Sequence, residues 1–264
     1  VHLLPGDSTF IKTLHYGLIG YPLTHSFSPA YFKKKFADQG IDALYEAFPL
    51  PDISGFPALL SDHPGISGLN VTIPHKETII PYLDELDTTA AEIGAVNCIT
   101  FTDGIKKGYN TDAVGFEQSL VPLLQSQHTH ALILGTGGSS KAVAYTLRQL
   151  GISFSHVSRD KSEGVLSYDE LTDDIIAAHK LIINTSPLGQ YPNMDDAPAI
   201  PYDSIGAGHL LYDLIYNPEE TKFLALGLAN GATVKNGFEM LQLQAEASWA
   251  IWSRYDARLL QEPF

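Results

Sequence analysis

The chain has 264 residues, 44% of them hydrophobic, and its 16 basic against 30 acidic residues give a formal net charge of −14. This length exceeds what one hydrophobic core usually supports, so we expect two domains. The acidic balance argues against nucleic acid or an anionic membrane surface as a partner. No apolar run approaches the roughly 20 residues of a membrane helix. The single cysteine, Cys98, excludes intramolecular disulfides and favours a reducing, cytoplasmic location.

Residues 1–14 form an extension whose role the sequence does not indicate. Between this extension and Asp112, short apolar runs alternate with amphipathic stretches. Ser28 and Pro29 predict the start of the first helix, with Ser28 as the N-cap. Asp103 and Gly104 predict the turn of a hairpin, because both accept positive φ angles. The elements expected in this half are strands at 16–19, 44–48 and 68–71, helices at 29–39, 76–83 and 88–93, and a hairpin over 96–109.

Beyond Asp112 the alternation of strands and helices becomes more regular and predicts parallel βαβ units. A long helical pattern containing Trp249 and Trp252 closes the chain, and we expect these two side chains to serve packing. No linker separates the halves, so a ligand is expected in the cleft where they meet. The predicted elements are strands at 131–134, 154–157, 181–184, 210–214 and 233–235, and helical stretches at 139–150, 168–178, 222–229 and 237–260.

A glycine-rich turn lies between an apolar strand and a helix, in the order Gly135, Thr136, Gly137, Gly138, Ser139. The first glycine allows the tight turn, and the second allows a pyrophosphate to approach the backbone. The helix N-terminus then offers free N–H groups to the phosphates. The alternative is a tight strand–helix turn without a ligand. The surrounding βα pattern favours dinucleotide binding.

The end of the next strand bears on which dinucleotide binds. A site for NAD usually has an acidic residue here, which binds the ribose 2′-hydroxyl. This chain has Arg159, placed to bind the 2′-phosphate of NADP, with Ser158 and Lys161 as additional donors. Asp160 favours NAD instead, and a solvated turn is the structural alternative. The sequence favours NADP.

Polar residues in the first half suggest a second site. Ser26 and Ser28 lie beside a helix N-terminus, which is suited to a carboxylate, although helix capping alone explains Ser28 equally well. Lys76 follows a strand, where ligands of open α/β sheets bind, and a partly desolvated lysine can transfer a proton. Asn97 lies in an apolar strand and needs buried partners. Taken singly, each of these residues, like Asp112, is more often structural or exposed than functional.

Taken together, these motifs resemble those of the shikimate dehydrogenase family. The resemblance extends from residue 16 to about residue 252. It is carried by Gly20-x-Pro22-x-x-His25-Ser26-x-Ser28-Pro29, Asn70-Val71-Thr72-x-Pro74-x-Lys76, Gly94-Ala95-Val96-Asn97, Asn110-Thr111-Asp112-x-x-Gly115, Asn184-Thr-Ser-Pro-Leu-Gly189, Asp213-Leu-Ile-Tyr216-Asn-Pro218 and Asn236-Gly237-Phe-Glu-Met240-Leu241-x-x-Gln244.

The resemblance implies a role for individual residues. Lys76 and Asp112 would form the catalytic pair at the hydroxyl being oxidised. The substrate carboxylate would be bound by Ser26 and Ser28 with Tyr216 nearby. The remaining implied contacts are Thr72, Asn97 and Gln244 for the ring hydroxyls, Gly135 to Ser139 with Ser158 and Arg159 for NADP, and Leu214, Gly237 and Met240 for the nicotinamide side.

The chain departs from the family pattern at four positions. Cys98 stands where Thr is common, Ser158 where Asn is common before the arginine, and Asp160 where many relatives carry Thr. Gln190 stands where Met is frequent after Pro-Leu-Gly. None of these changes removes an implied catalytic group.

The resemblance implies an α/β fold of two domains: an N-terminal α/β substrate domain completed by the C-terminal helix, and a Rossmann-type NADP-binding domain. The expected boundaries are 1–112 plus 237–264 for the substrate domain and 113–236 for the dinucleotide domain. The implied activity is NADP-dependent, reversible reduction of 3-dehydroshikimate to shikimate in chorismate and aromatic amino acid biosynthesis. The alternatives are an NAD-dependent quinate/shikimate dehydrogenase and a non-catalytic ligand-binding regulator. No metal site is expected, because His128 and His130 lack carboxylate partners. The oligomeric state is not predicted.

Overall fold

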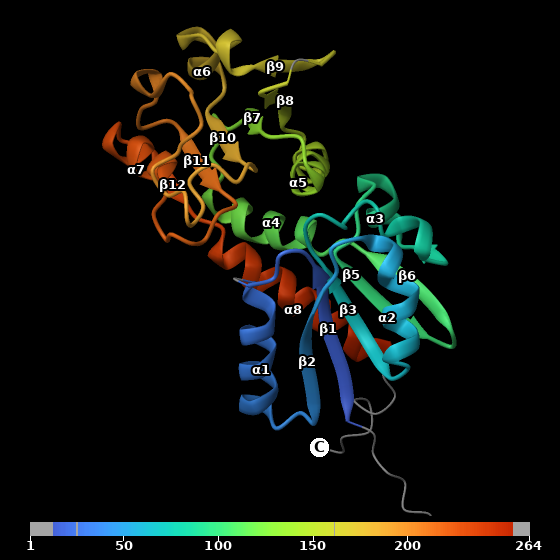
Figure 1. Ribbon diagram of the computed structural model, residues 1–264. Helices are drawn as coiled ribbons and strands as arrows, with labels where there is room; N and C mark the ends of the chain where they lie inside the picture. Colours follow the sequence, from blue (N-terminus) through green and yellow to red (C-terminus); the bar gives the residue numbers. More distant parts are fainter. Residues whose placement is uncertain (1–12, 25, 161, 256–264) are drawn as a thin grey trace, which may run out of the picture.

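A computed structural model describes residues 13–24, 26–160 and 162–255. It consists of two α/β lobes, each built on a six-stranded sheet (Figure 1). The first lobe holds strands β1 to β6 and the second holds β7 to β12. The fold class expected from the sequence, two α/β domains with a Rossmann-type second domain, is confirmed.

The first sheet has the order β2-β1-β3-β5-β6-β4 and mixes parallel with antiparallel pairs. Phe32 and Phe36 of α1 pack against one face, whereas Phe56 of α2 and Ala90 of α3 pack against the other. The elements are β1 (Leu14–Gly20), α1 (Phe27–Gln39), β2 (Ala43–Pro49), α2 (Phe56–Asp62), β3 (Ile66–Val71), β4 (Glu85–Leu86), α3 (Thr88–Ile93), β5 (Cys98–Thr102) and β6 (Ile105–Tyr109).

The second sheet has the order β12-β11-β10-β7-β8-β9, and all its pairs are parallel. The order reverses between the neighbours β7 and β10, which is where ligands bind in open parallel sheets. Its elements are α4 (Asp112–Leu120), β7 (His130–Leu134), α5 (Gly138–Gln149), β8 (Ser153–Ser158), β9 (Val165–Ser167), α6 (Asp173–Ala178), β10 (Leu181–Asn184), β11 (Leu210–Asp213), α7 (Lys222–Ala229) and β12 (Thr233–Lys235).

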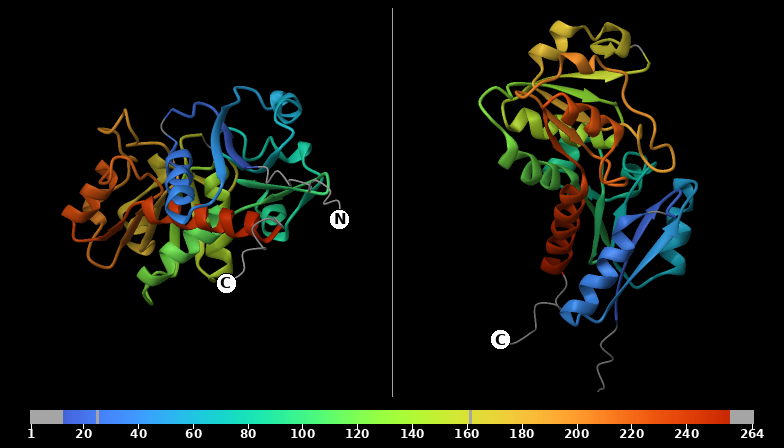
Figure 2. Two further views of the ribbon diagram at one scale, coloured as in Figure 1. Left: turned by 90° about the horizontal axis from the view of Figure 1, so that it is seen from below. Right: turned by 90° about the vertical axis from the view of Figure 1, so that its left-hand side faces the viewer.

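The last helix, α8 (Phe238–Tyr255), runs from the second lobe back along the first (Figure 2). Trp252 is 2% exposed, its ring stacks on Tyr16 with 4.7 Å between centroids, and its indole N–H donates to the Ile99 carbonyl at 3.0 Å. A Cβ on Gly68 would come within 2.4 Å of the Trp252 indole nitrogen, so only glycine admits the ring there. The C-terminal helix therefore completes the first core, as expected.

Helix α4 lies between the lobes in Figure 1 and packs against both α5 and α8. A Cβ on Gly115 would approach the Met240 carbonyl oxygen to 2.6 Å, so the missing side chain permits this close helix contact. The chain thus crosses between the lobes at α4 and again ahead of α8. The boundaries 1–112 plus 237–264 and 113–236 remain a prediction.

Two sequence predictions about helices are wrong. Residues 76–83 form turns and a short 3-10 helix (Ile80–Tyr82), because Pro81 has no N–H to donate. Helix α1 begins two residues early, with Ser26 rather than Ser28 as the N-cap. Pro29 is accommodated within the first turn, where the N–H groups have no intrahelical acceptor. Helix α2, the 3-residue β9 and the 2-residue β4 were not expected.

The hairpin prediction is confirmed. β5 pairs antiparallel with β6, and the turn between them has positive φ at Asp103 (52°) and Gly104 (80°). The predicted extension at 1–14 falls mostly, and the helix end at 256–260 wholly, outside the described residues.

Candidate active site

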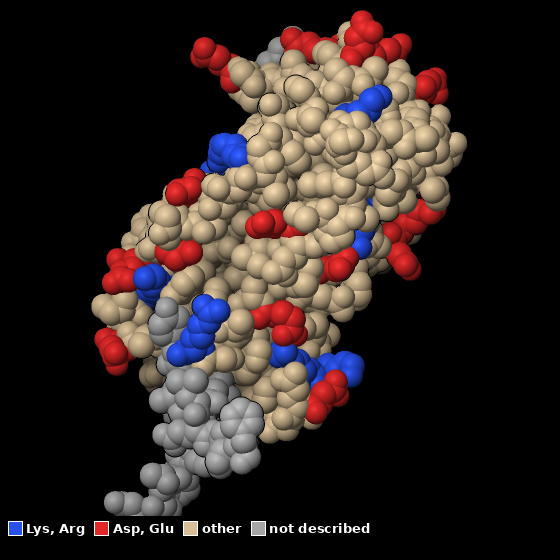
Figure 3. Space-filling model, turned by 180° about the vertical axis from the view of Figure 1, so that it is seen from behind, with Lys and Arg blue, Asp and Glu red and all other residues tan. Residues whose placement is uncertain are grey.

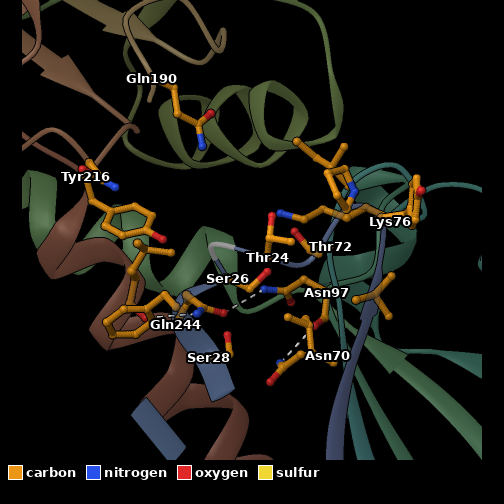
Figure 4. Close-up of a pocket in the computed structure, with 18 of the residues that line it drawn as sticks. Thr24, Ser26, Ser28, Asn70, Thr72, Lys76, Asn97, Gln190, Tyr216 and Gln244 are labelled. Atoms are coloured by element: carbon orange, nitrogen blue, oxygen red, sulfur yellow. Dashed lines mark hydrogen bonds between the residues drawn. The ribbon is translucent and has the colours of Figure 1, made fainter. Parts of the chain in front are cut away.

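A cavity of about 470 Å³ lies between the lobes, and we call it the interlobe cavity (Figure 4). The first lobe contributes the loop after β1, the end of β3 and Asn97. The second lobe contributes the loops after β10 and β11, and α8 contributes Gln244. All the residues predicted as the catalytic pair or as substrate contacts line this cavity together: Ser26, Ser28, Thr72, Lys76, Asn97, Asp112, Tyr216 and Gln244.

Lys76 and Asp112 form an ion pair at one side of the interlobe cavity. The Lys76 Nζ lies 2.7 Å from the Asp112 carboxylate, and their side chains are 14% and 9% exposed. Asp112 is the first residue of α4, where the helix dipole favours a negative charge. Charged groups so little exposed need partners, and each of these two side chains is the partner of the other.

Asn97 fixes the other side of this carboxylate. Its amide nitrogen donates to Asp112 Oδ1 at 2.9 Å and to the Thr111 hydroxyl at 2.9 Å. Its oxygen accepts from the Thr111 backbone N–H at 2.7 Å. The expectation that a buried Asn97 amide finds partners is confirmed. The Asp112 carboxylate is thereby held between a cation and an amide donor.

The opposite end of the cavity is formed by the start of α1. Ser26 caps this helix without a side-chain capping bond, and Ser28 is buried in its first turn. Tyr216 faces both from the second lobe (Figure 4), and its ring meets Phe27 edge-on with centroids 6.1 Å apart. Burial raises the pKa of Tyr216, so its phenol is a neutral hydrogen-bond donor at neutral pH. Hydroxyl donors at a helix N-terminus suit a carboxylate.

Other residues line the cavity but were not predicted as site residues, and the polar side chains of Thr24, Asn70 and Gln190 are among them. The Asn70 amide is already bonded to Tyr45, to the Asn97 carbonyl and to Ser248, so it supports the wall. The only sequence signal for Gln190 was its departure from the family pattern. Nothing in the pattern indicated Thr24.

A second cavity of about 310 Å³, the glycine-loop cavity, adjoins the first and shares Lys76 with it. It is lined by Gly137, Gly138, Ser139 and Thr185 from the second lobe. The Ser139 hydroxyl lies 3.4 Å from Lys76 Nζ. Lys76 therefore stands at the junction of the two cavities.

The glycine-rich turn has the shape that a dinucleotide requires. Gly135 has φ of 122°, and a Cβ there would lie 2.6 Å from the Thr185 hydroxyl, at the reversal point of the sheet. Around Gly137 a Cβ would meet nothing within 4 Å, which leaves the backbone open to a ligand. Ser140, in the position of a third glycine, is buried and donates to the Gly137 carbonyl at 2.6 Å. The residues present fit a bound pyrophosphate.

The other predicted cofactor residues lie apart from these cavities. Ser158 ends β8, its hydroxyl accepts from the Asp160 N–H at 3.3 Å, and Arg159 is exposed. Lys161 lies outside the described residues. Neither cavity is lined by Thr136, Leu214, Gly237 or Met240. Gly237 is needed for packing, because a Cβ would lie 2.1 Å from the Leu214 carbonyl oxygen.

Among the described residues no group of three or more His, Cys, Asp or Glu could hold a metal ion. The same part of the chain has no helix long and apolar enough to cross a membrane. On the face shown in Figure 3, acidic side chains cover more of the surface than basic side chains do, in keeping with the net negative charge of the chain.

A glycine-rich turn at the reversal point of a parallel sheet, with a Lys–Asp pair at the adjoining polar cavity, defines a two-domain, dinucleotide-binding protein of the dehydrogenase type. Residues 18–99 match the family described as the shikimate dehydrogenase substrate binding domain. The NADP(+) shikimate dehydrogenase of Methanosphaera stadtmanae is 38% identical over 261 residues, which cover 92% of each chain.

Two solved structures agree with this match. Shikimate dehydrogenase from Aquifex aeolicus has a TM-score of 0.83 at 32% identity, covering 96% of this chain and 99% of that one. The enzyme from Thermus thermophilus, solved with NADP(H) and shikimate, has a TM-score of 0.81 at 29% identity and covers 90% and 93%. This chain belongs to the shikimate dehydrogenase family.

Proposed function

We propose that this chain catalyses the NADP-dependent, reversible interconversion of shikimate and 3-dehydroshikimate, with reduction serving chorismate and aromatic amino acid biosynthesis. The observation that carries this proposal is the Lys76–Asp112 pair, because Lys76 lines both the interlobe cavity and the glycine-loop cavity. A substrate hydroxyl beside Lys76 lies at the junction with the cofactor side. The names of the relatives support the choice of substrate and cofactor.

The substrate would be oriented by its two ends. We assign its carboxylate to the hydroxyls of Ser26 and Ser28, the N-terminus of α1 and the Tyr216 phenol. We assign its ring hydroxyls to Thr72, Asn97 and Gln244, which line the same cavity. This arrangement puts the remaining hydroxyl next to Lys76.

The protein would move the proton of the oxidised hydroxyl. In the direction of oxidation the uncharged amine of Lys76 would accept this proton as the ring carbon loses hydride and becomes a carbonyl. In the direction of reduction the ammonium form of Lys76 would return the proton. Asp112, held by Asn97, keeps Lys76 oriented and compensates its charge. When bound, NADP supplies the nicotinamide carbon that exchanges the hydride with the substrate.

The cofactor would be held by the second lobe. The N–H groups at Gly135 to Ser139 and the start of α5 suit its pyrophosphate. Ser158 and Arg159 suit its 2′-phosphate. Leu214, Gly237 and Met240 are proposed for the nicotinamide side on the family resemblance alone.

A second candidate is an NAD-dependent quinate/shikimate dehydrogenase, favoured by the exposed Asp160 beside Arg159. The deciding experiment follows nicotinamide absorbance with shikimate or quinate, each combined with NADP or NAD. The highest kcat/KM for shikimate with NADP supports the proposal. The highest value for NAD supports the second candidate, and no turnover in any combination favours a non-catalytic regulator.

A cytoplasmic location is part of the proposal. Burial of Cys98 raises the pKa of its thiol to about 12, so this single cysteine is a packed core residue with little thiolate at neutral pH. The lack of any second cysteine agrees with a reducing compartment.

A further inference from the structure

Gln190 belongs to the second lobe but faces the interlobe cavity. It follows β10 and the Pro187–Gly189 turn, and it lines the cavity together with Ser26 and Lys76 of the first lobe. In Figure 4 its side chain extends toward the space that Ser26, Thr72 and Lys76 border. A ligand in this cavity is therefore contacted from the second lobe as well as from the first.

The backbone at Gln190 is held in place. Its N–H donates to the Pro187 carbonyl at 3.1 Å, and its carbonyl accepts from the Asn193 N–H at 2.9 Å. The next residue, Tyr191, donates its N–H to the Asn217 carbonyl at 3.2 Å, which ties this loop to the loop after β11. The Gln190 side chain thus starts from a defined point on the cavity wall.

The Gln190 amide makes no hydrogen bond to a side chain or backbone group in the described part of the chain, so both its donor and its acceptor are available. Two other amides of the same wall are engaged, since Asn97 bonds Thr111 and Asp112, and Asn70 bonds Tyr45. An amide lining a polar cavity with both functions available suits a ligand with hydroxyl or keto groups.

We propose that Gln190 is a specificity-determining residue, whose amide hydrogen-bonds a hydroxyl on the ring edge of the substrate that faces the second lobe. This inference rests on the proposed function. The carboxylate end is assigned to Ser26 and Ser28 and the reacting hydroxyl to Lys76, so Gln190 reaches a third edge of the ring. A site built to bond a hydroxyl discriminates against analogues that lack it.

The test compares wild type with Gln190→Met, which keeps the side-chain length and removes both hydrogen-bonding atoms. Asn193→Leu is the matched control, because Asn193 is exposed on the same loop and does not line the cavity. Each protein is assayed for the KM of shikimate at saturating NADP and for the KM of NADP at saturating shikimate. Shikimate analogues lacking one non-reacting ring hydroxyl are measured in parallel.

We expect Gln190→Met to raise the KM of shikimate about 3- to 10-fold, as for one neutral hydrogen bond, and to leave the KM of NADP within about 2-fold. Asn193→Leu should match wild type. For the analogue missing the hydroxyl that Gln190 bonds, wild type and Gln190→Met should have equal KM values. An unchanged KM of shikimate in Gln190→Met, or an effect only on NADP, would overturn the inference. Absence of shikimate turnover in wild type would overturn the proposed function and this inference with it.

Discussion

Because of Asp213, we expect the stability of the folded protein to depend on pH. Its carboxylate is fully buried at the end of β11 and accepts hydrogen bonds from Thr221 at 2.6 Å and from Asn184 and the Ile215 N–H at 3.0 Å. Burial outweighs these bonds and raises the pKa of Asp213 from 3.8 to about 7. The folded protein therefore binds a proton here that the unfolded chain has lost above about pH 4.

This difference in bound protons decides whether the free energy of unfolding rises or falls with pH. A raised carboxyl pKa lowers the free energy of unfolding as pH rises from about 4 to about 7, because deprotonation favours the unfolded chain. The full difference corresponds to roughly 4 kcal/mol, of which roughly 2–3 kcal/mol falls between about pH 5 and pH 8. Asp213→Asn removes the titration while keeping the shape, so its stability relative to wild type should increase by that amount across this range.

Urea unfolding of both proteins at pH 5, 6, 7 and 8 measures this difference directly, and other titrating groups cancel between them. Asp103→Asn is the control, since Asp103 is exposed in the β5–β6 turn and Asn accepts the positive φ there. Its difference from wild type should stay constant. If the Asp213→Asn difference is also constant with pH, burial does not govern this carboxyl and the reasoning is refuted.

The remaining predictions concern the proposed site. Lys76→Ala should lower kcat by about 100- to 10,000-fold with a smaller change in the KM of shikimate. Turnover within a few-fold of wild type would show that Lys76 does not transfer the proton. Arg159→Ala should raise the KM of NADP by roughly 10- to 150-fold and leave that of NAD nearly unchanged, and equal effects would favour Asp160 as the ribose ligand. Ser26→Ala and Ser28→Ala should each weaken shikimate binding in a titration, since each removes a donor to a charged group. In thermal melts Ser26→Ala should cost little, because its hydroxyl makes no capping bond, whereas Ser28→Ala removes a buried hydroxyl and should lower the Tm; the reverse order would contradict this assignment.

Much of the fold could be predicted from periodicity and turn residues. The apolar runs of β3 and β7 predict buried strands, and the glycine-rich turn at Gly135 predicts the βα unit that contains it. The two short strands β4 and β9 have too few residues to show a period. The helix expected at 76–83 has an amphipathic pattern, but Pro81 has no N–H to donate, so only a short 3-10 helix forms there.

The residues of the candidate site could also be predicted only in part. Lys76, Asn97 and Asp112 were expected as a group through the family resemblance, and the structure places them within hydrogen-bonding distance. No local pattern predicts that Gln190 faces the same cavity, because this depends on how the two lobes are set against each other. Tyr216, also on a loop of the second lobe, could be predicted because it lies within a family motif, whereas Gln190 departs from the family pattern at its position.

The position of α8 has a consequence for how the protein forms in the cell. Tyr16 emerges early from the ribosome, but the indole of Trp252 that stacks on it is made only after the whole second lobe. During synthesis the second lobe can close its sheet while one face of the first sheet stays uncovered. Chains stalled before α8 therefore carry an exposed aromatic surface that includes Tyr16 and Phe36, and they are the species that chaperones and proteases would meet.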